Sequence, residues 1–194
     1  MFLKPGHHID TYDLQSRGCS RTMATAAHIE LSLATAGVYH VPDITTEASE
    51  ICSQLLQENH DRYHIFFNLS RFHNHIVHHL VTIWALGATP AELQKAYDNN
   101  RGIQRLQFPV HPDIVRDMAN RDQFKEFLGQ EQYFHDYEVF FRNEIEAQGW
   151  EAVLNEHLFA RDEHADRMLT RMFAGKREDP PSWPDVGLDH PKCQ

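Results

Sequence analysis

The spacing of the apolar residues constrains the fold of this chain more than any other feature. Between residues 45 and 175 they recur every three to four positions, and no segment keeps the alternation of apolar and polar residues that a half-buried strand shows. That period places apolar side chains on one face of an α-helix. Because 41% of the 194 residues are apolar, the chain can build its own hydrophobic core. We therefore predict an all-α fold, a helical bundle or array.

Capping residues set the expected ends of the helices. Gly87 is expected to end one helix, and Thr89 followed by Pro90 to start the next. Gly149 separates the last two helices. The expected helices run from Thr45 or Thr46 to about Tyr63 and over residues 72–86, 89–97, 124–146 and 150–173, with a loop over residues 111–122.

The composition changes at both ends of this helical region. Residues 1–43 mix Gly, Pro, Thr and His without a period, which predicts a poorly ordered lead-in, and translation from Met23 instead of Met1 is an open alternative. Residues 176–194 contain four prolines and no helical pattern, which predicts a tail. The predicted organisation is one helical domain over residues 44–175 between two disordered ends.

Charge and composition exclude several classes of partner. The chain has 18 Lys and Arg against 28 Asp and Glu, a formal net charge of -10, and an acidic surface repels nucleic acid. No run approaches the roughly 18 apolar residues that a membrane span needs. The three cysteines form no CxxC pair and the start has no signal-peptide core, so we expect a cytoplasmic protein in a reducing compartment. Its oligomeric state is left open.

Histidine is unusually frequent, with 15 residues, and six of them lie between residues 60 and 79. His60 and His64 are four positions apart, as are His75 and His79, so each pair shares one face of its helix. The helix over residues 72–86 is apolar around much of its circumference and is expected to be buried. The sequence therefore predicts a histidine-rich core.

Buried imidazoles need partners for their ring nitrogens, and a metal ion is one such partner. Two pairs on neighbouring helices would supply four nitrogens to one ion. We therefore predict a metal site formed by His60, His64, His75 and His79. The alternative is that these rings bond to backbone carbonyls, carboxylates and water, and no catalytic base is indicated.

Several other features allow more than one interpretation. The dipeptide His60-Asp61 also occurs in metal-dependent phosphohydrolases, which gives a third function to consider. Aromatic residues at helical spacing over residues 124–141 are typical of a core and could also line a cavity for a flat ligand. His135 and Asp136 are expected at the edge of that core. The charged group Glu156, His157, Asp162, Glu163 and His164 is expected to form a solvated face. No nucleophile motif, phosphate loop or dinucleotide fingerprint is present.

Three segments together resemble one known family. They are LLQENHDRYHIFFN (55–68), FHNHIVHHLVTIWALGATPAELQKAYDNN (72–100) and YFHDYEVFFRNEI (133–145). Their NHxxYH and HNHxxHH spacings are similar to those of the questin-oxidase family, fungal oxidoreductases of secondary metabolism that are described as Baeyer–Villiger-type oxidases. The resemblance covers about residues 45–175.

The resemblance implies an α-helical oxidoreductase that opens a ring of an anthraquinone or related small aromatic polyketide with molecular oxygen. It also implies NADPH as reductant and, for at least some members, non-haem iron held by histidines and a carboxylated lysine. His60, His64, His75 and His79 fall within the family's histidine motifs.

The chain also departs from the family pattern. Family members are usually more than twice as long and continue past the segment that matches MFAG (172–175) into a second helical half. Here only His190-Pro191 is similar to the HP motif that follows. Whether this chain is an enzyme is therefore left open, and the alternative is a truncated, non-catalytic helical remnant that binds metal or a partner.

Overall fold

The structure is a computed structural model that describes the backbone of residues 25–174 and the side chains of residues 25–172. The predicted tail, residues 176–194, and the first half of the predicted lead-in lie outside the described residues. Between residues 25 and 174 the regular structure is helical, with isolated bridges at Tyr63–Leu106 and Phe66–His73. The predicted all-α fold is confirmed.

The elements follow one another along the chain without a long insertion. In order they are α1 (Thr46–Arg62), α2 (Ile76–Ala85), α3 (Pro90–Arg101), α4 (Pro112–Asp117), α5 (Arg121–Phe127), the 3-10 helix η1 (Glu131–Tyr133), α6 (Phe134–Gln148), α7 (Trp150–Leu154), the π-helix η2 (Asn155–Phe159) and α8 (Glu163–Ala174).

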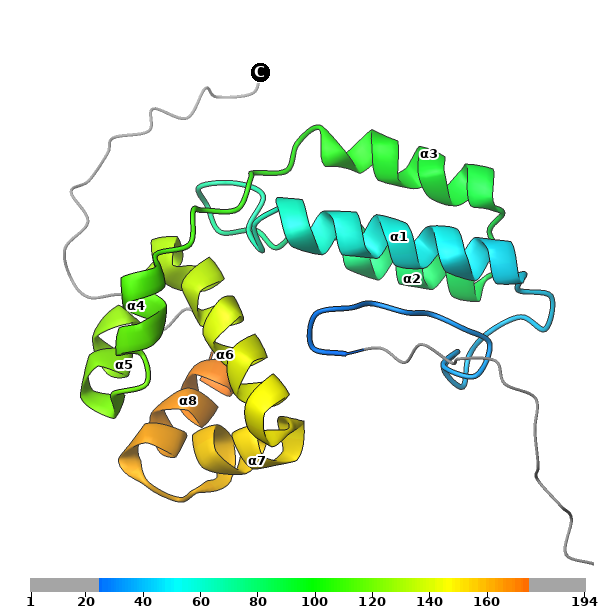
Figure 1. The fold of residues 1–194 in the computed structure, drawn as a ribbon. Coiled ribbons are helices and arrows are strands. Elements are labelled where there is room, and N and C mark those ends of the chain that lie inside the picture. Colours follow the sequence, from blue (N-terminus) through cyan, green and yellow to red (C-terminus); the bar gives the residue numbers. More distant parts are fainter. Residues whose placement is uncertain (1–24, 175–194) are drawn as a thin grey trace, which may run out of the picture.

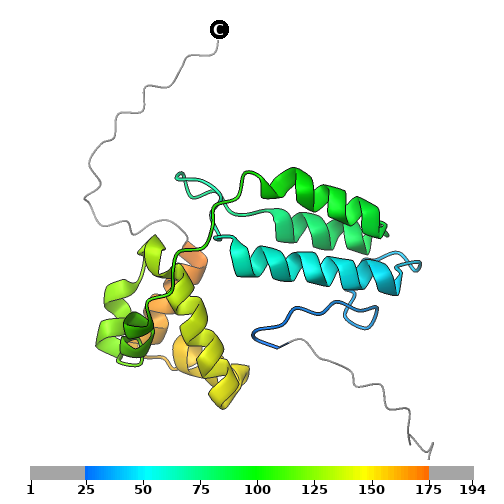
Figure 2. The ribbon, with the colours of Figure 1, turned by 45° about the horizontal axis from the view of Figure 1, so that its top comes forward.

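The helices form two groups, which we name the α1–α3 unit and the α4–α8 unit (Figure 1). Helices α1, α2 and α3 pack side by side, and the segment after α3 leads into the second group, as a turned view also shows (Figure 2). None of the helices within the described part of the chain combines the length and apolar character needed to cross a bilayer.

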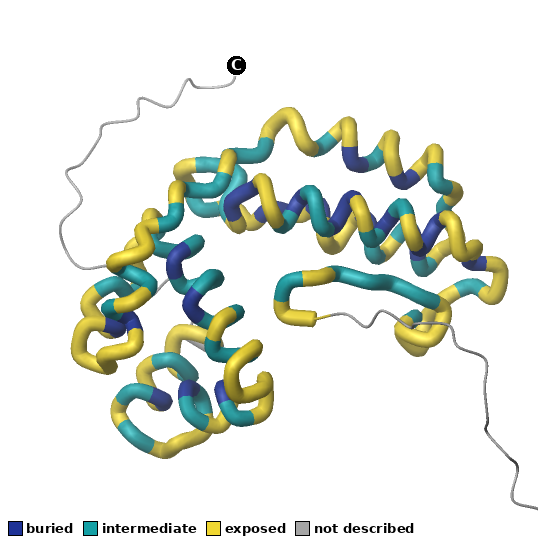
Figure 3. The backbone as a smooth tube through the Cα atoms, in the orientation of Figure 1, coloured by how far each residue is buried: buried dark blue, intermediate teal, exposed yellow. Residues whose placement is uncertain are grey.

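Each unit has its own hydrophobic core, seen as buried stretches on the inner helix faces in Figure 3. The core of the α1–α3 unit is built around Leu80, Trp84 and Leu93, and the indole of Trp84 donates a hydrogen bond to Ser49 Oγ at 3.1 Å. The core of the α4–α8 unit is built around Phe124 and Phe140. Full burial of one such side chain contributes about 1.5–3 kcal/mol.

The expected capping is confirmed at three helix ends. Thr45 caps α1 by accepting a hydrogen bond from the backbone N–H of Ala48. Thr89 and Glu92 form a reciprocal capping box at the start of α3. Gly149 ends α6 with a φ of 86°, a conformation that favours glycine.

The helix predicted from residue 72 starts at Ile76 instead. Asn74 Oδ1 accepts a hydrogen bond from the N–H of Ile76, the first residue of α2, at 3.0 Å, and Arg71 has a φ of 59°. Residues 63–75 are therefore a loop, and His75 is the residue that precedes the helix. The apolar period predicted a helix that continues back to residue 72, but the local hydrogen bond from the Ile76 N–H to the Asn74 side chain favours a turn before α2.

Two long helices and one loop were also predicted incorrectly. Residues 124–146 are divided at Gly129, which has a φ of 80°, and residues 150–173 are divided near Arg161, which has a φ of 58°. The predicted loop over residues 111–122 contains α4, which starts at Pro112. Proline at the first helical position and left-handed backbone conformations set these boundaries.

Part of the predicted lead-in is attached to the α1–α3 unit. Residues 27–31 run beside α1 (Figure 1), where the backbone N–H groups of Ile29 and Leu31 donate to Gln57 Oε1 at 2.9 Å and Ser53 Oγ at 2.8 Å. The described half of the lead-in therefore contributes to the packed structure.

Candidate functional site

The two histidine-rich motifs meet through their asparagines. Asn74 Nδ2, just before α2, donates to Asn59 Oδ1 near the end of α1 at 2.8 Å, and both side chains are buried. Because Asn74 Oδ1 also accepts a hydrogen bond from the first N–H group of α2, this bond joins the end of one helix to the start of the next. The spacing of the histidines in these motifs gives no indication of this asparagine pair.

A pocket of about 430 Å³ lies beside this asparagine pair. It opens where the end of α1 and the start of α2 approach the first turns of α6, and most of its surface is apolar. Its lining residues are Ile29, Leu31, Leu56, Asn59, His60, Tyr63, Ile65, Asn74, Val77, Val81, Gln107, Phe134 and Glu138. A concave, mostly apolar surface with a few polar groups is typical of a small-molecule site.

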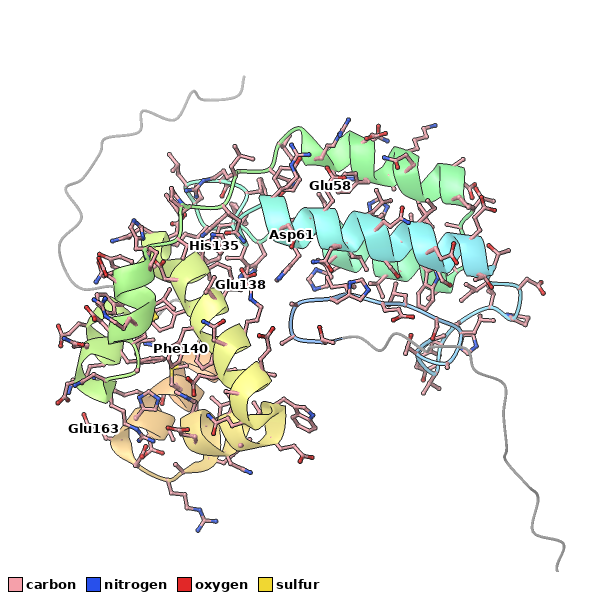
Figure 4. The ribbon with its side chains drawn as sticks, viewed as in Figure 1. Glu58, Asp61, His135, Glu138, Phe140 and Glu163 are labelled. Atoms are coloured by element: carbon pink, nitrogen blue, oxygen red, sulfur yellow. The ribbon has the colours of Figure 1, made fainter. Side chains whose placement is uncertain are left out.

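His60 and Glu138 both line this pocket and form an ion pair, with 2.8 Å between His60 Nε2 and Glu138 Oε1. Figure 4 shows Glu138 on the side of α6 that faces the end of α1 where Asp61 lies. The hydrogen bond that His60 donates to the Glu138 carboxylate raises the pKa of His60, although burial partly opposes it. Burial alone would raise the pKa of Glu138, but His60 lowers it overall. The pair therefore joins the two units by a charge-assisted hydrogen bond.

His64 is fully buried at the boundary between the two units. Its Nδ1 accepts a hydrogen bond from the Phe66 N–H at 3.0 Å, and its Nε2 has no hydrogen-bond partner among the described residues. Its ring packs against Phe66, Phe108 and Phe134 at centroid distances of 5.3–5.6 Å. Burial lowers the pKa of His64, so the neutral ring is favoured.

His75 and His79, in contrast, are exposed on the surface of the α1–α3 unit. His79 Nδ1 lies 3.4 Å from Asn100 Nδ2, and the ring of His75 lies near that of His78, with 5.7 Å between the centroids. The predicted histidine-rich core is therefore not found in the described residues. The face of α2 that is buried is the one with Ile76, Leu80 and Trp84.

The four histidines predicted as metal ligands do not fit an iron centre in the described structure. In residues 25–172 no three or more His, Cys, Asp or Glu side chains are close enough together to hold a metal ion. His60 binds a carboxylate, His64 lies among phenylalanine rings, and His75 lies at the surface. Metal binding by these residues stays a prediction without support from this geometry.

Two further histidines near the boundary between the units, His111 and His135, each have their ring Nδ1 within hydrogen-bond distance of an oxygen atom. The fully buried carboxylate of Asp136 accepts from the His111 backbone N–H at 2.6 Å and pairs with His111 Nδ1 at 3.0 Å. His135 Nδ1 lies 2.7 Å from the carbonyl oxygen of Phe108, which agrees with its predicted place at a core edge. His111 was overlooked because no histidine spacing marks it in the sequence.

The residues expected to form a solvated face contain a partly buried histidine pair. His157 Nδ1 and His164 Nε2 are 2.8 Å apart, and both rings pack against Phe124. Burial lowers the pKa of both histidines. His157 lies in the π-helix η2, which aims it inward, and a π-helix cannot be read from a 3.6-residue period.

The structure defines an all-α protein with a mostly apolar pocket where its two helical units meet. The chain belongs to the questin oxidase-like family, whose family model matches residues 72–177. That match contains Asn74, the helices α2 and α3, and every element of the α4–α8 unit.

Curated relatives agree with this assignment. The chain is 39% identical over 153 residues to a questin oxidase of Aspergillus terreus, covering 79% of this chain and 34% of the relative. It is 36% identical over 152 residues to the Baeyer-Villiger oxidase ptaJ of Pestalotiopsis fici, covering 78% of this chain and 34% of that relative. It is 38% identical over 154 residues to the oxidoreductase AflY of Aspergillus parasiticus, covering 78% and 31%. The chain spans about a third of the length of these relatives.

Proposed function

We propose that this chain binds a flat aromatic polyketide, such as a hydroxyanthraquinone, in the pocket between its two units and takes part in oxidative, Baeyer–Villiger-type cleavage of the ring. The pocket is the observation that carries this proposal, because its volume of about 430 Å³ and its apolar walls suit an aromatic ring system. The printed names of the relatives, questin oxidase and Baeyer-Villiger oxidase, support the same class of reaction.

The apolar and the polar residues of the pocket suit different parts of such a ligand, its ring faces and its hydroxyl groups. Val77, Val81 and Phe134 offer apolar surface to the ring faces. Gln107 lies in the lining, and its Oε1 is buried without a partner among the described residues, so a ligand hydroxyl would satisfy it. The His60–Glu138 pair supplies the charged side of the rim.

In the proposed reaction, one atom of molecular oxygen is inserted beside a ring carbonyl, and NADPH supplies the two electrons that reduce the other atom to water. Binding and orientation are the contributions of the residues described here. NADPH and iron belong to the proposal through the family resemblance alone, since the described histidines do not fit a metal centre.

Binding tests the pocket directly. We expect 1,8-dihydroxyanthraquinone to bind the purified chain in a fluorescence titration, and Val77→Trp, which fills the pocket, to weaken its affinity at least tenfold. Leu69→Trp is the control, because Leu69 is 88% exposed and does not line the pocket. Equal binding by both variants would place the ligand elsewhere and reject the proposal.

Oxygen consumption separates the enzyme from the non-catalytic alternative. An enzyme consumes oxygen and NADPH when the quinone is added, and a remnant binds the quinone without consuming either. The non-catalytic alternative is kept as the second candidate because residues 25–172 bring together no three side chains that could hold a metal ion. The phosphohydrolase alternative gains no support: His60 binds Glu138, while Asp61 accepts a hydrogen bond from Gln57.

A further inference from the structure

The segment before α1 forms part of the candidate pocket. Ile29 and Leu31 line its wall, facing residues of α1, α2 and α6 across the pocket. Both also pack against the core of the α1–α3 unit. This segment lies outside residues 72–177, the part of the chain that the family model matches.

The segment is held to α1 by side chains. Besides the hydrogen bonds from the Ile29 and Leu31 backbones to Gln57 and Ser53, Gln57 Nε2 donates to the Ala27 carbonyl at 3.3 Å. The backbone–backbone hydrogen bonds found for residues 25–36 are local to the segment. A segment held by three side-chain hydrogen bonds and the apolar contacts of Ile29 and Leu31 can open locally while α1 stays folded.

A second hollow, which we name the outer hollow, adjoins the same segment. Its volume is about 960 Å³, and it is lined by residues 28–35 and by residues of α1 between Thr46 and Gln57. Ile29 and Leu31 line this hollow as well as the pocket, so the segment separates the two. Figures 1 and 2 both show it running beside α1.

We propose that residues 27–33 are a movable strap that closes the pocket and that Ile29 and Leu31 select the width of the ring system it admits. The identity of the ligand rests on the proposed function, whereas the movement of the strap does not. When the bonds to Gln57 and Ser53 break, the strap moves toward the outer hollow and widens the pocket.

The selectivity of the strap is tested with two probes of different width, the two-ring 5-hydroxy-1,4-naphthoquinone and the three-ring 1,8-dihydroxyanthraquinone. We expect the double variant Ile29→Ala/Leu31→Ala to bind the three-ring probe about tenfold more weakly. We also expect it to reduce the preference for three rings over two. Leu33→Ala is the matched control, because Leu33 lines the outer hollow and is absent from the pocket lining.

The outcomes distinguish the two proposals. If Val77→Trp abolishes binding while the double variant binds both probes as the unchanged chain does, the pocket is correct and the strap is rejected. If the unchanged chain binds neither probe, the proposed function fails, and the movement of the strap is decided by a measurement without ligand.

That measurement is amide hydrogen exchange. We expect the Ile29 and Leu31 amides to exchange at least a hundredfold faster than those in the middle of α1, and faster still in Gln57→Ala. Gln54→Ala is the control, since Gln54 lies on α1 beside the outer hollow and makes none of the hydrogen bonds found to the strap. Protection of Ile29 and Leu31 equal to that of α1, or equal exchange in both variants, would overturn the strap.

Discussion

Asn59 and Asn74 link the ends of two helices in a way that neither could do alone. A buried amide needs partners for its oxygen and its NH2 group, and Asn74 finds them in Asn59 and in the backbone of α2. The neighbouring histidines of the same motifs point to different partners or to the surface. The link fixes one wall of the pocket, so the asparagines are the motif residues with the clearest structural role.

Asp136 gives a test at the scale of one residue. Its carboxylate accepts two hydrogen bonds from His111, and Asp136→Asn would turn an NH2 group toward one of these donors. We expect the free energy of unfolding to fall by about 1–3 kcal/mol, because a buried donor is left unpaired. Urea denaturation followed by circular dichroism measures the change.

Asp113→Asn is the control for this substitution, because the Asp113 side chain is 82% exposed and pairs with Arg116 at the surface. It is expected to change stability by less than about 0.5 kcal/mol. Similar losses for both variants would show that the buried His111–Asp136 pair contributes little.

At the scale of elements, local capping explains most of the correct boundaries. Thr45, Thr89 and Gly149 act within one turn of the helix that they limit, so their effect is visible in the sequence. Two of the errors arose beside residues other than glycine whose backbone is left-handed, Arg71 and Arg161. Such conformations in residues other than glycine need support from the surrounding structure, so a local pattern does not reveal them.

The π-helix η2 and α8 give a pH-dependent prediction. Burial lowers the folded-state pKa of His157 and His164, so the unfolded chain takes up protons near pH 6.5 while the folded chain resists them. The contribution of the pair is therefore complete above pH 6.5 and is lost as the pH falls through the lower folded pKa values. The loss is at most about 1.4 kcal/mol per pH unit for each histidine.

Charged side chains around His157 and His164 shift the pKa of these histidines in opposite directions. Arg121 disfavours protonation, whereas Glu156 and Asp162 favour it, although both carboxylates also pair with Arg121. We expect thermal unfolding between pH 7.5 and 5 to show a smaller loss of Tm in His164→Gln than in the unchanged chain. His79→Gln, at an exposed position, is expected to retain the full loss. If Tm falls equally with pH in all three proteins, the His157–His164 pair is not the source of the pH dependence.

At the scale of the whole molecule, two cores are connected by a polar seam. Backbone hydrogen bonds join His64 to Arg105 and Gln107 to Arg62, both at 2.9 Å, and Arg105 pairs with Glu131 at the start of η1. The His60–Glu138 pair and the ring contacts of His64 complete the seam. Because each unit has its own core, we expect the two units to lose stability separately, whereas the pocket depends on both.

Removing one large side chain from each core tests this independence. Phe124→Ala is expected to cost about 3–5 kcal/mol and to raise amide exchange mainly in the α4–α8 unit. Leu93→Ala, in the core of the other unit, is expected to cost about 2–5 kcal/mol and to raise exchange mainly in the α1–α3 unit. Exchange that rises equally throughout both units in either variant would show one cooperative structure.

The sequence by itself determined the helical class, the main capping residues and the family, because periodicity, caps and motif spacing are local properties of the chain. The tertiary structure decided which side of each helix is buried and which side chains meet. His60 finds Glu138, 78 positions later, and His111 finds Asp136, while His75 remains at the surface. These pairings depend on how the loops over residues 63–75 and 102–111 bring the two units together, and a helical period carries no information about that arrangement.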